Sequence, residues 1–188
     1  MDRTEEDRLI NRILAGEKNV YRYFIQEYQQ MAYSISISII KRHNDTQDAV
    51  QNAFIFAYKS LGSFKRESKF SSWLYRIVVN ESLKQIKRSK TQLKYIDFNN
   101  YDSLAESTFN DALRSIELSE KQKAINEVIL LLKPKEALVL SLHYLHEKSL
   151  KEITEISGFT LSNVKVLLFR ARKSFMGKYL EKNNYYER

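Results

Sequence analysis

The sequence predicts an all-α protein made of two small helical domains joined by a flexible polar linker. Helix-breaking residues are scarce, with one proline and four glycines in 188 residues, so a helix must stop at few places. Apolar residues recur at steps of three and four, whereas alternating strand patterns are nearly absent. Weak periodicity and many Asn, Asp, Glu and Ser residues at 93–118 indicate the linker. We therefore expect domains at 1–92 and 119–182, followed by a frayed tail at 183–188.

Short turn signals divide the first domain into helices. Gly16 follows the first helix, the Asn-Asp pair at 44–45 ends the second, and Thr46 can cap the third. Gly62 ends the third helix, and a loop precedes the fourth. Isoleucine and serine alternate at 35–40, which could indicate a strand, but helical patterns flank this segment and the chain offers no partner strand. The expected helices are 5–15, 20–42, 47–61 and 71–90.

The second domain is expected to contain a helix-turn-helix. Pro134 suits the first position of a helix, because its missing N–H would be unpaired there in any case. Ser149 and Glu152 form a capping box, in which each side chain can accept a bond from a free backbone N–H near the other residue. Gly158 suits a left-handed helix end, and Thr160 can cap the next helix. The expected helices are 119–132, 135–145 and 149–157, before a final helix that starts at 161.

The final helix is basic on its predicted outer face. Residues 157–180 include five basic and no acidic residues, which suits a helix that faces DNA phosphates. Its predicted buried stripe consists of Leu161, Val164, Leu168, Ala171 and Phe175. Its predicted outer face consists of Ser162, Asn163, Val166, Arg170 and Lys173, flanked by Lys165 and Arg172. A solvated basic helix is the alternative, but the capped partner helix and the glycine turn favour DNA binding.

A second basic block lies in the first domain. The net charge of +8 is unevenly distributed: residues 65–94 include nine basic and two acidic groups, whereas 95–120 include one and six. Aromatic rings accompany these cations, a mixture that can hold single-stranded DNA by base stacking and phosphate contacts. Phe70 and Trp73 have the spacing of core residues. The better contact candidates are Phe64, Lys65, Arg66, Lys69, Arg76, Lys84 and Arg88.

Other classes of protein fit the composition poorly. The chain has no cysteine, and its three histidines, His43, His143 and His146, make a poor zinc set, so we expect no metal site and no cofactor. Neither a glycine-rich phosphate loop nor a nucleophile–base pair is present, which argues against an enzyme. The charged N-terminus and the absence of a long apolar run predict a cytoplasmic protein without membrane insertion.

Four motifs in order resemble the extracytoplasmic-function (ECF) sigma factors of the sigma-70 family. The first is Asp-x-x-Asp-Ala-Val-Gln-x-x-Phe at 45–54, and the second is Phe-x-x-Trp-Leu-Tyr-Arg-Ile-x-x-Asn at 70–80. Leu-x-Pro at 132–134 and Val-Lys at 164–165, followed by Arg-Ala-Arg at 170–172, complete the set. The motifs cover nearly the whole chain.

The resemblance implies a subunit that binds the β and β′ subunits of core RNA polymerase and directs it to promoter DNA. It implies polymerase contacts for Asp48, Gln51 and Phe54. It implies melting and capture of the −10 element by Phe64, Lys65, Arg66, Lys69, Arg76, Asn80, Lys84 and Arg88. It implies −35 recognition by Ser162, Asn163, Lys165, Val166, Arg170 and Lys173. An anti-sigma factor is a usual further partner in this family.

The chain departs from the family pattern at two places, and one other reading stays open. Asn52 stands where relatives often have Glu, and Val166-Leu167 stands where they frequently have Ser-Arg, so the −35 sequence does not transfer from relatives. The alternative is a free-standing helix-turn-helix regulator, which would bind a palindromic operator as a dimer. Such a regulator has no need of the aromatic and basic loop at 64–70.

Overall fold

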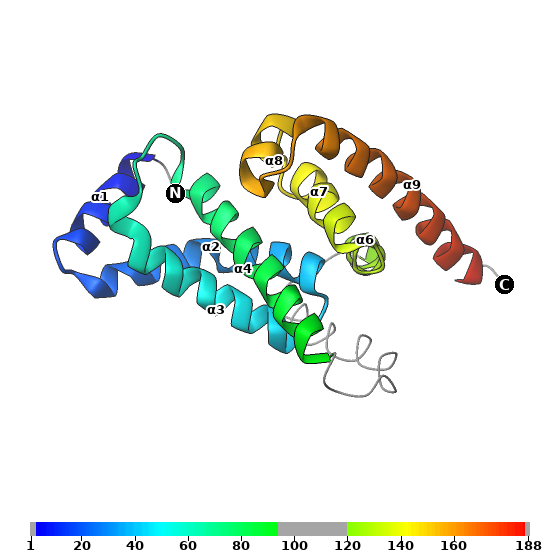
Figure 1. Ribbon diagram of the computed structural model, residues 1–188, viewed down its shortest axis with the longest axis horizontal. Coiled ribbons are helices and arrows are strands. Elements are labelled where there is room, and N and C mark those ends of the chain that lie inside the picture. The colour runs from blue at the N-terminus through cyan, green and yellow to red at the C-terminus, as the bar shows by residue number, and fades with distance from the viewer. Residues whose placement is uncertain (1–2, 94–119, 187–188) are drawn as a thin grey trace.

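All the regular secondary structure in the part of the chain that the structure describes is helical. The computed structural model describes the backbone of residues 3–93 and 120–186 and the side chains of 3–89 and 122–182. Within these ranges there is no strand (Figure 1). The elements are α1 (Arg3–Leu14), η1 (Lys18–Tyr21), α2 (Arg22–Ile40), α3 (His43–Ser60), η2 (Leu61–Ser63), α4 (Phe70–Leu93), α6 (Glu120–Leu130), α7 (Pro134–Tyr144), α8 (Leu150–Ser157) and α9 (Leu161–Tyr186). The prediction of an all-α protein is confirmed, and the alternating segment at 35–40 is helix.

The first unit is a bundle of α2, α3 and α4, with α1 at one end. The fully buried Phe24 of α2 stands at its centre, and its ring centroid lies 4.4 Å from that of Phe70. The alanines of α3 at 49, 53 and 57 are buried, and small side chains let neighbouring helices approach closely. Tyr28 donates a hydrogen bond to the buried carboxylate of Glu6, which joins α1 to α2.

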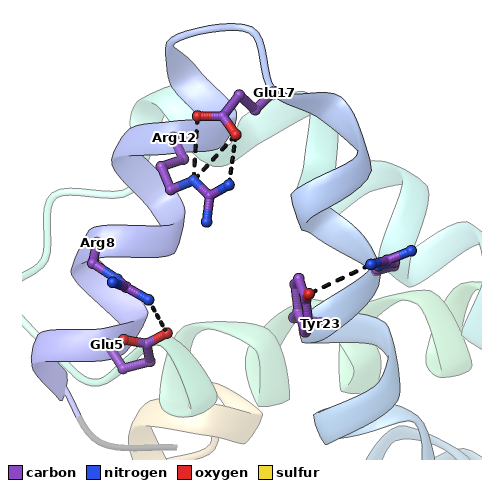
Figure 2. Close-up of polar contacts among 6 residues, drawn as sticks. Glu5, Arg8, Arg12, Glu17 and Tyr23 are labelled. Atoms are coloured by element: carbon purple, nitrogen blue, oxygen red, sulfur yellow. Dashed lines mark hydrogen bonds and ion pairs between the residues drawn. The ribbon is translucent and has the colours of Figure 1, made fainter.

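Exposed ion pairs lie on α1 and on the turn that follows it. Arg12 is paired with Glu17 at 2.6 Å and Arg8 with Glu5 at 3.0 Å. Both pairs are drawn in Figure 2. The hydrogen bond to Arg12, together with its positive charge, lowers the pKa of the Glu17 carboxyl. Because these pairs are open to solvent, they add little to stability. The buried contacts of the bundle therefore contribute most of the stability of the first unit.

The junction between α2 and α3 differs from the prediction. Lys41 adopts a left-handed conformation with φ of 66°, and its N–H donates to the carbonyl of Ile37, which ends α2. The chain then turns at once, so α3 begins at His43 and the residues at 44–45 lie inside it. Thr46 is not a cap. Its side chain is buried and donates to the carbonyl of Arg42 at 2.7 Å.

The helix-turn-helix forms as its local signals predict. The capping box of Ser149 and Glu152 is present, and Gly158 ends α8 in a left-handed conformation with φ of 72°. Thr160 accepts a hydrogen bond from the N–H of Asn163, so it caps α9. Pro134 stands at the start of α7 as expected. The backbone of α9 continues to Tyr186, beyond the point at which a frayed tail was expected.

The two units are packed against each other. In Figure 1, α7 and α8 lie alongside α2 and α4, and contacts join α7 to α2 and α8 to α4. Buried apolar residues of both units form one continuous hydrophobic core. The predicted linker at 93–118 lies outside the described residues, except for Leu93 at the end of α4. The sequence left the relative position of the units open.

Candidate nucleic-acid interface

The outer face of α9 presents every residue that the sequence proposes for −35 recognition. Val164, Leu168 and Ala171 are buried, as predicted. Leu161 is wrongly placed in the buried stripe, since it is 47% exposed. At about 100° per residue it lies about 120° from Leu167, which is buried in its stead. The proposed readers are all exposed: Ser162, Asn163, Lys165, Val166, Arg170 and Lys173.

Phe169 is a residue on this face that the sequence analysis missed. Its side chain is 69% exposed, more than that of any other large apolar residue in the described part of the chain. It lies seven residues after Ser162 and four before Lys173, so it shares their face of the helix. That spacing was the available signal. A Phe ring among polar and basic side chains can contact thymine methyl groups in a major groove.

Arg172 differs from the residues proposed for −35 recognition, because its side chain is bound within the protein. Its Nε donates to the Tyr144 hydroxyl at 2.7 Å, and its guanidinium lies 5.5 Å from the centre of the same ring. These contacts tie α9 to α7. The charge of Arg172 therefore remains beside the outer face of α9, while its side chain is held by Tyr144.

The aromatic residues of the first unit form one packed cluster beneath the basic loop. Phe70 is 1% exposed, so its predicted place in the core is confirmed. Phe64, the ring preferred for base contact, is half-buried and packs on Phe70 at 5.8 Å and on Trp73 at 5.1 Å between ring centroids. The Phe64 ring thus supports the loop, and its base contact stays a prediction.

Arg66 is bound by α1. Its backbone is left-handed, with φ of 60°, and its guanidinium donates to the side-chain oxygen of Asn11 at 2.5 Å. The carboxylate of Asp7 lies 3.7 Å away. Lys65 and Lys69 remain exposed on the same loop. The loop therefore keeps two solvent-facing cations, whereas Arg66 fixes its shape.

Four proposed −10 contacts follow one side of α4. Arg76, Asn80, Lys84 and Arg88 are spaced by four residues and are all exposed. Lys84 forms an ion pair with Glu81 at 2.6 Å. Arg76 turns to the second unit, where its Nε donates to the backbone carbonyl of Glu155 at 3.0 Å. One of the four proposed −10 contacts is therefore already bonded to α8.

The proposed polymerase contacts lie on α3 at the edge of a groove. Asp48 and Gln51 are exposed, whereas Phe54 is 6% exposed and its carbonyl accepts a bond from the Tyr21 hydroxyl at 2.8 Å. The buried Phe54 ring therefore packs in the core of the first unit and holds α3 in place. All three line a groove of about 1870 Å³ that also involves residues of α2, α6 and α7.

His146 lines this groove and joins the two units. Its Nδ1 lies 3.1 Å from the Tyr75 hydroxyl of α4, and its Nε2 lies 3.3 Å from the Ser34 hydroxyl of α2. Burial lowers the pKa of His146 to about 4, and the nearby charge of Lys148 acts in the same direction. Burial also raises the pKa of Tyr75 to about 12. Both groups are therefore neutral at pH 7.

Metal and membrane sites are not seen in the described part of the chain. Over 3–89 and 122–182, no three His, Asp or Glu side chains gather as metal ligands would. None of the helices described is long and apolar enough to cross a bilayer.

Comparisons with known proteins agree with this arrangement. The family model for sigma-70 region 2 matches residues 24–92, and that for sigma-70 region 4 matches 118–175. The ECF sigma factor SigW of Bacillus subtilis (strain 168) is 30% identical over 175 residues, which cover 88% of this chain and 91% of SigW. The ECF sigma-E factor of Haemophilus influenzae is 29% identical over 184 residues, covering 92% of this chain and 94% of that one.

Two solved structures share the fold at low sequence identity. The sigma factor RpoE, solved in complex with the anti-sigma factor NepR from Bartonella quintana, has a TM-score of 0.67 at 17% identity and covers 84% of this chain and 95% of RpoE. CnrH, solved in complex with the cytosolic domain of CnrY, has a TM-score of 0.59 at 17% identity and covers 90% and 94%.

The fold and the two family matches define a sigma-70 protein with regions 2 and 4. Within that class, the chain belongs to the ECF sigma factors. Its function is thus promoter-directed initiation of transcription with RNA polymerase. The free-standing regulator is not favoured, because the region 2 match spans α2 to α4 and includes the basic loop.

Proposed function

We propose how individual residues of this chain divide the work of a sigma factor. Asp48 and Gln51 on α3 bind core RNA polymerase, and the loop 64–69 with the outer side of α4 holds the −10 strand. The outer face of α9 reads the −35 element in the major groove. The observation that carries this division is that two basic faces are exposed on separate helices, one in each sigma region.

The physical roles follow from the side chains. Lys65 and Lys69 can follow a phosphate backbone, and extrusion of one base takes a few kcal/mol that such contacts must offset. Arg170 can donate two hydrogen bonds to a guanine, and Val166 can touch a thymine methyl. The role is binding and positioning, without catalysis by this chain. We place it in the cytoplasm, where DNA and RNA polymerase are found.

Run-off transcription tests this proposal as a whole. Core RNA polymerase is incubated with genomic fragments of the organism, with and without the protein, and transcript start sites are mapped. Specific starts that require the protein support the proposal and reveal both promoter elements. Absence of such transcripts, with tight binding of the protein alone to a palindromic duplex, would establish the regulator instead.

Removing the exposed polymerase contacts should weaken holoenzyme assembly. Asp48→Ala combined with Gln51→Ala is expected to reduce the affinity for core polymerase about tenfold or more, since interface residues that matter contribute about 1–2 kcal/mol each. Both side chains are exposed, so the fold should be unchanged. Affinity is measured by fluorescence anisotropy of labelled protein titrated with core polymerase. Gln26→Ala, an exposed change on α2, is the control, and equal affinity of the folded double variant would refute the role of α3.

Arg170→Ala should affect −35 recognition selectively. Loss of a two-bond contact to a base is expected to reduce discrimination at one position by about 1–3 kcal/mol. Transcription is measured on promoters with an intact and with a scrambled −35 element. We expect the variant to lose activity on the first and to match the parent protein on the second. An equal loss on both would assign Arg170 to phosphate contact or to another step.

A further inference from the structure

The loop at 64–69, here called the −10 loop, is fixed at both ends by backbone hydrogen bonds. At its start the N–H of Phe64 donates to the carbonyl of Leu61 at 3.1 Å. At its end the carbonyl of Lys69 accepts from the N–H of Ser72 at 3.1 Å, in the first turn of α4. The middle of the loop lies between these bonds and is held by a different element, the helix α1.

Helix α1 binds the middle of the −10 loop through Arg66. The guanidinium of Arg66 donates to Oδ1 of Asn11 at 2.5 Å, and its Nε lies 3.7 Å from the carboxylate of Asp7. In the opposite direction, Nη2 of Arg3 donates to the backbone carbonyl of Arg66 at 2.7 Å. The three α1 residues are spaced by four positions, so they share one face of the helix. One helix face therefore binds both the side chain and the backbone of a single loop residue.

These contacts stabilise an unfavourable backbone conformation. Arg66 has φ of 60°, in the left-handed region, where the Cβ of any residue except glycine crowds the following carbonyl oxygen. A residue with a side chain keeps this conformation only when the surrounding structure fixes it. Without the bonds to α1, the loop would relax to another backbone conformation. The exposed side chain of Lys65, one residue earlier, would then point in another direction.

Helix α1 is itself held firmly enough to serve as a support. Its side chains at Leu9, Ile10 and Ile13 are buried in the hydrophobic core. The buried carboxylate of Glu6 accepts a hydrogen bond from Tyr28 of α2. The match to sigma-70 region 2 begins only at residue 24, so it assigns no role in promoter recognition to α1.

We infer that α1 positions the −10 loop: Asn11, together with Asp7 and Arg3, holds Arg66 in its left-handed conformation and so directs Lys65 toward the −10 strand. Arg66 is a positioning residue, whose guanidinium is bound by the protein. Asn11 influences −10 recognition through Arg66, without a DNA contact of its own. This inference rests on the proposed function, in which the loop holds the −10 strand.

Substitutions of Asn11 test the inference, because this side chain is exposed and its loss should leave the fold intact. We expect Asn11→Ala to lower opening of the −10 element about three- to tenfold, the effect of losing one hydrogen bond. Asn11→Asp should restore most of the opening, since a carboxylate accepts the same bond from Arg66. Opening is measured with the holoenzyme by the fluorescence of 2-aminopurine within the −10 element. Arg8→Ala, another exposed change on α1, is the control.

Two substitutions of Arg66 separate positioning from DNA contact. Arg66→Ala and Arg66→Gly both remove the guanidinium, but only glycine adopts the left-handed conformation without strain. We expect the glycine variant to retain about five times as much opening as the alanine variant, because of the strain that alanine has there. In the Arg66→Gly background, Asn11→Ala should have no further effect, because its partner is gone. Equal losses with alanine and glycine, or additive losses in the double variant, would overturn the inference.

Base preference distinguishes positioning from a general loss of folded protein. Transcription is measured on promoters found by run-off mapping, with the parental −10 element and with single-base changes in it. A smaller amount of folded protein reduces every promoter by the same factor, whereas a displaced loop changes the ratios between promoters. We expect Asn11→Ala to change these ratios, and Asn11→Asp and Arg8→Ala to keep those of the parent protein. Unchanged ratios with Asn11→Ala would overturn the inference, whereas failure of the parent protein to direct specific starts would overturn the proposed function itself.

Discussion

Replacing Phe70 by alanine is expected to lower the free energy of unfolding by about 3–5 kcal/mol, the usual range for a buried Phe. Phe70 is 1% exposed, and its ring packs on Phe24, Phe64 and Trp73 with centroids 4.4, 5.8 and 5.5 Å away. The loop that holds Lys65 and Lys69 rests on this cluster. The variant should therefore also lose −10 opening at temperatures where part of it still folds.

Urea unfolding followed by circular dichroism measures the effect. Phe169→Ala is a matched control in the same chain, because Phe169 is 69% exposed and its truncation should change stability by less than about 0.5 kcal/mol. A loss below about 1 kcal/mol in Phe70→Ala would mean that the aromatic cluster does not support the first unit.

Lowering the pH from 6.5 to about 4 is expected to weaken the docking of the two units by about two orders of magnitude. His146 has a pKa of about 4 when docked and about 6.5 when exposed to water. Because the docked pKa is the lower one, docking favours the neutral ring. The contribution of the neutral His146 ring to docking is intact above pH 6.5. The docking equilibrium constant then falls about tenfold per pH unit as the pH drops toward 4.

The surroundings of His146 explain why protonation should open the contact. The imidazole faces the Tyr75 hydroxyl of α4 and the Ser34 hydroxyl of α2, and the ammonium group of Lys148 lies near enough to oppose a second positive charge. No carboxylate contributes to its pKa shift among the described residues. A protonated ring would therefore be desolvated without a partner of opposite charge.

The pH response is measured with bimane attached to Glu155→Cys, since Glu155 and Trp73 line the same small cleft between α4 and α8 and Trp73 should quench the dye while the units are docked. Fluorescence of bimane on Glu155→Cys should rise as the pH falls through this range. His146→Gln can keep hydrogen bonds to both hydroxyls without titrating, so it should retain quenching and lose most of the pH response. An unchanged response in that variant would assign the effect to carboxylates or to general acid unfolding.

Local signals predicted the elements because they act within a few residues. The capping box of Ser149 and Glu152, the left-handed Gly158 and the N-terminal Pro134 each act on the adjacent turn, and each appears as expected. Thr46 shows the limit of such reasoning. A threonine side chain can cap the start of a helix or donate to a carbonyl four residues earlier within the helix. Because the left-handed Lys41 ends α2 and lets α3 begin earlier, Thr46 lies inside α3 and makes the second kind of bond.

For the candidate site, the sequence predicted which helix faces are exposed but not which side chains are bound within the protein. Spacing placed Ser162 to Lys173 outward on α9, because a helix surface follows directly from about 100° per residue. Spacing could not show that Phe54 is buried, that Arg66 is bound to Asn11, or that Arg172 is bound to Tyr144. Those outcomes depend on neighbours from other helices.

The sequence by itself determined that this protein is an all-helical sigma factor with two separate basic faces, since periodicity, caps and charge are properties of short segments. Only the tertiary structure decided that α8 lies on α4, that Arg76 is engaged by Glu155, and that His146 is held neutral between the units. These features need contacts between residues far apart in the chain. Burial, which sets both the packing and the pKa of His146, exists only once those segments meet.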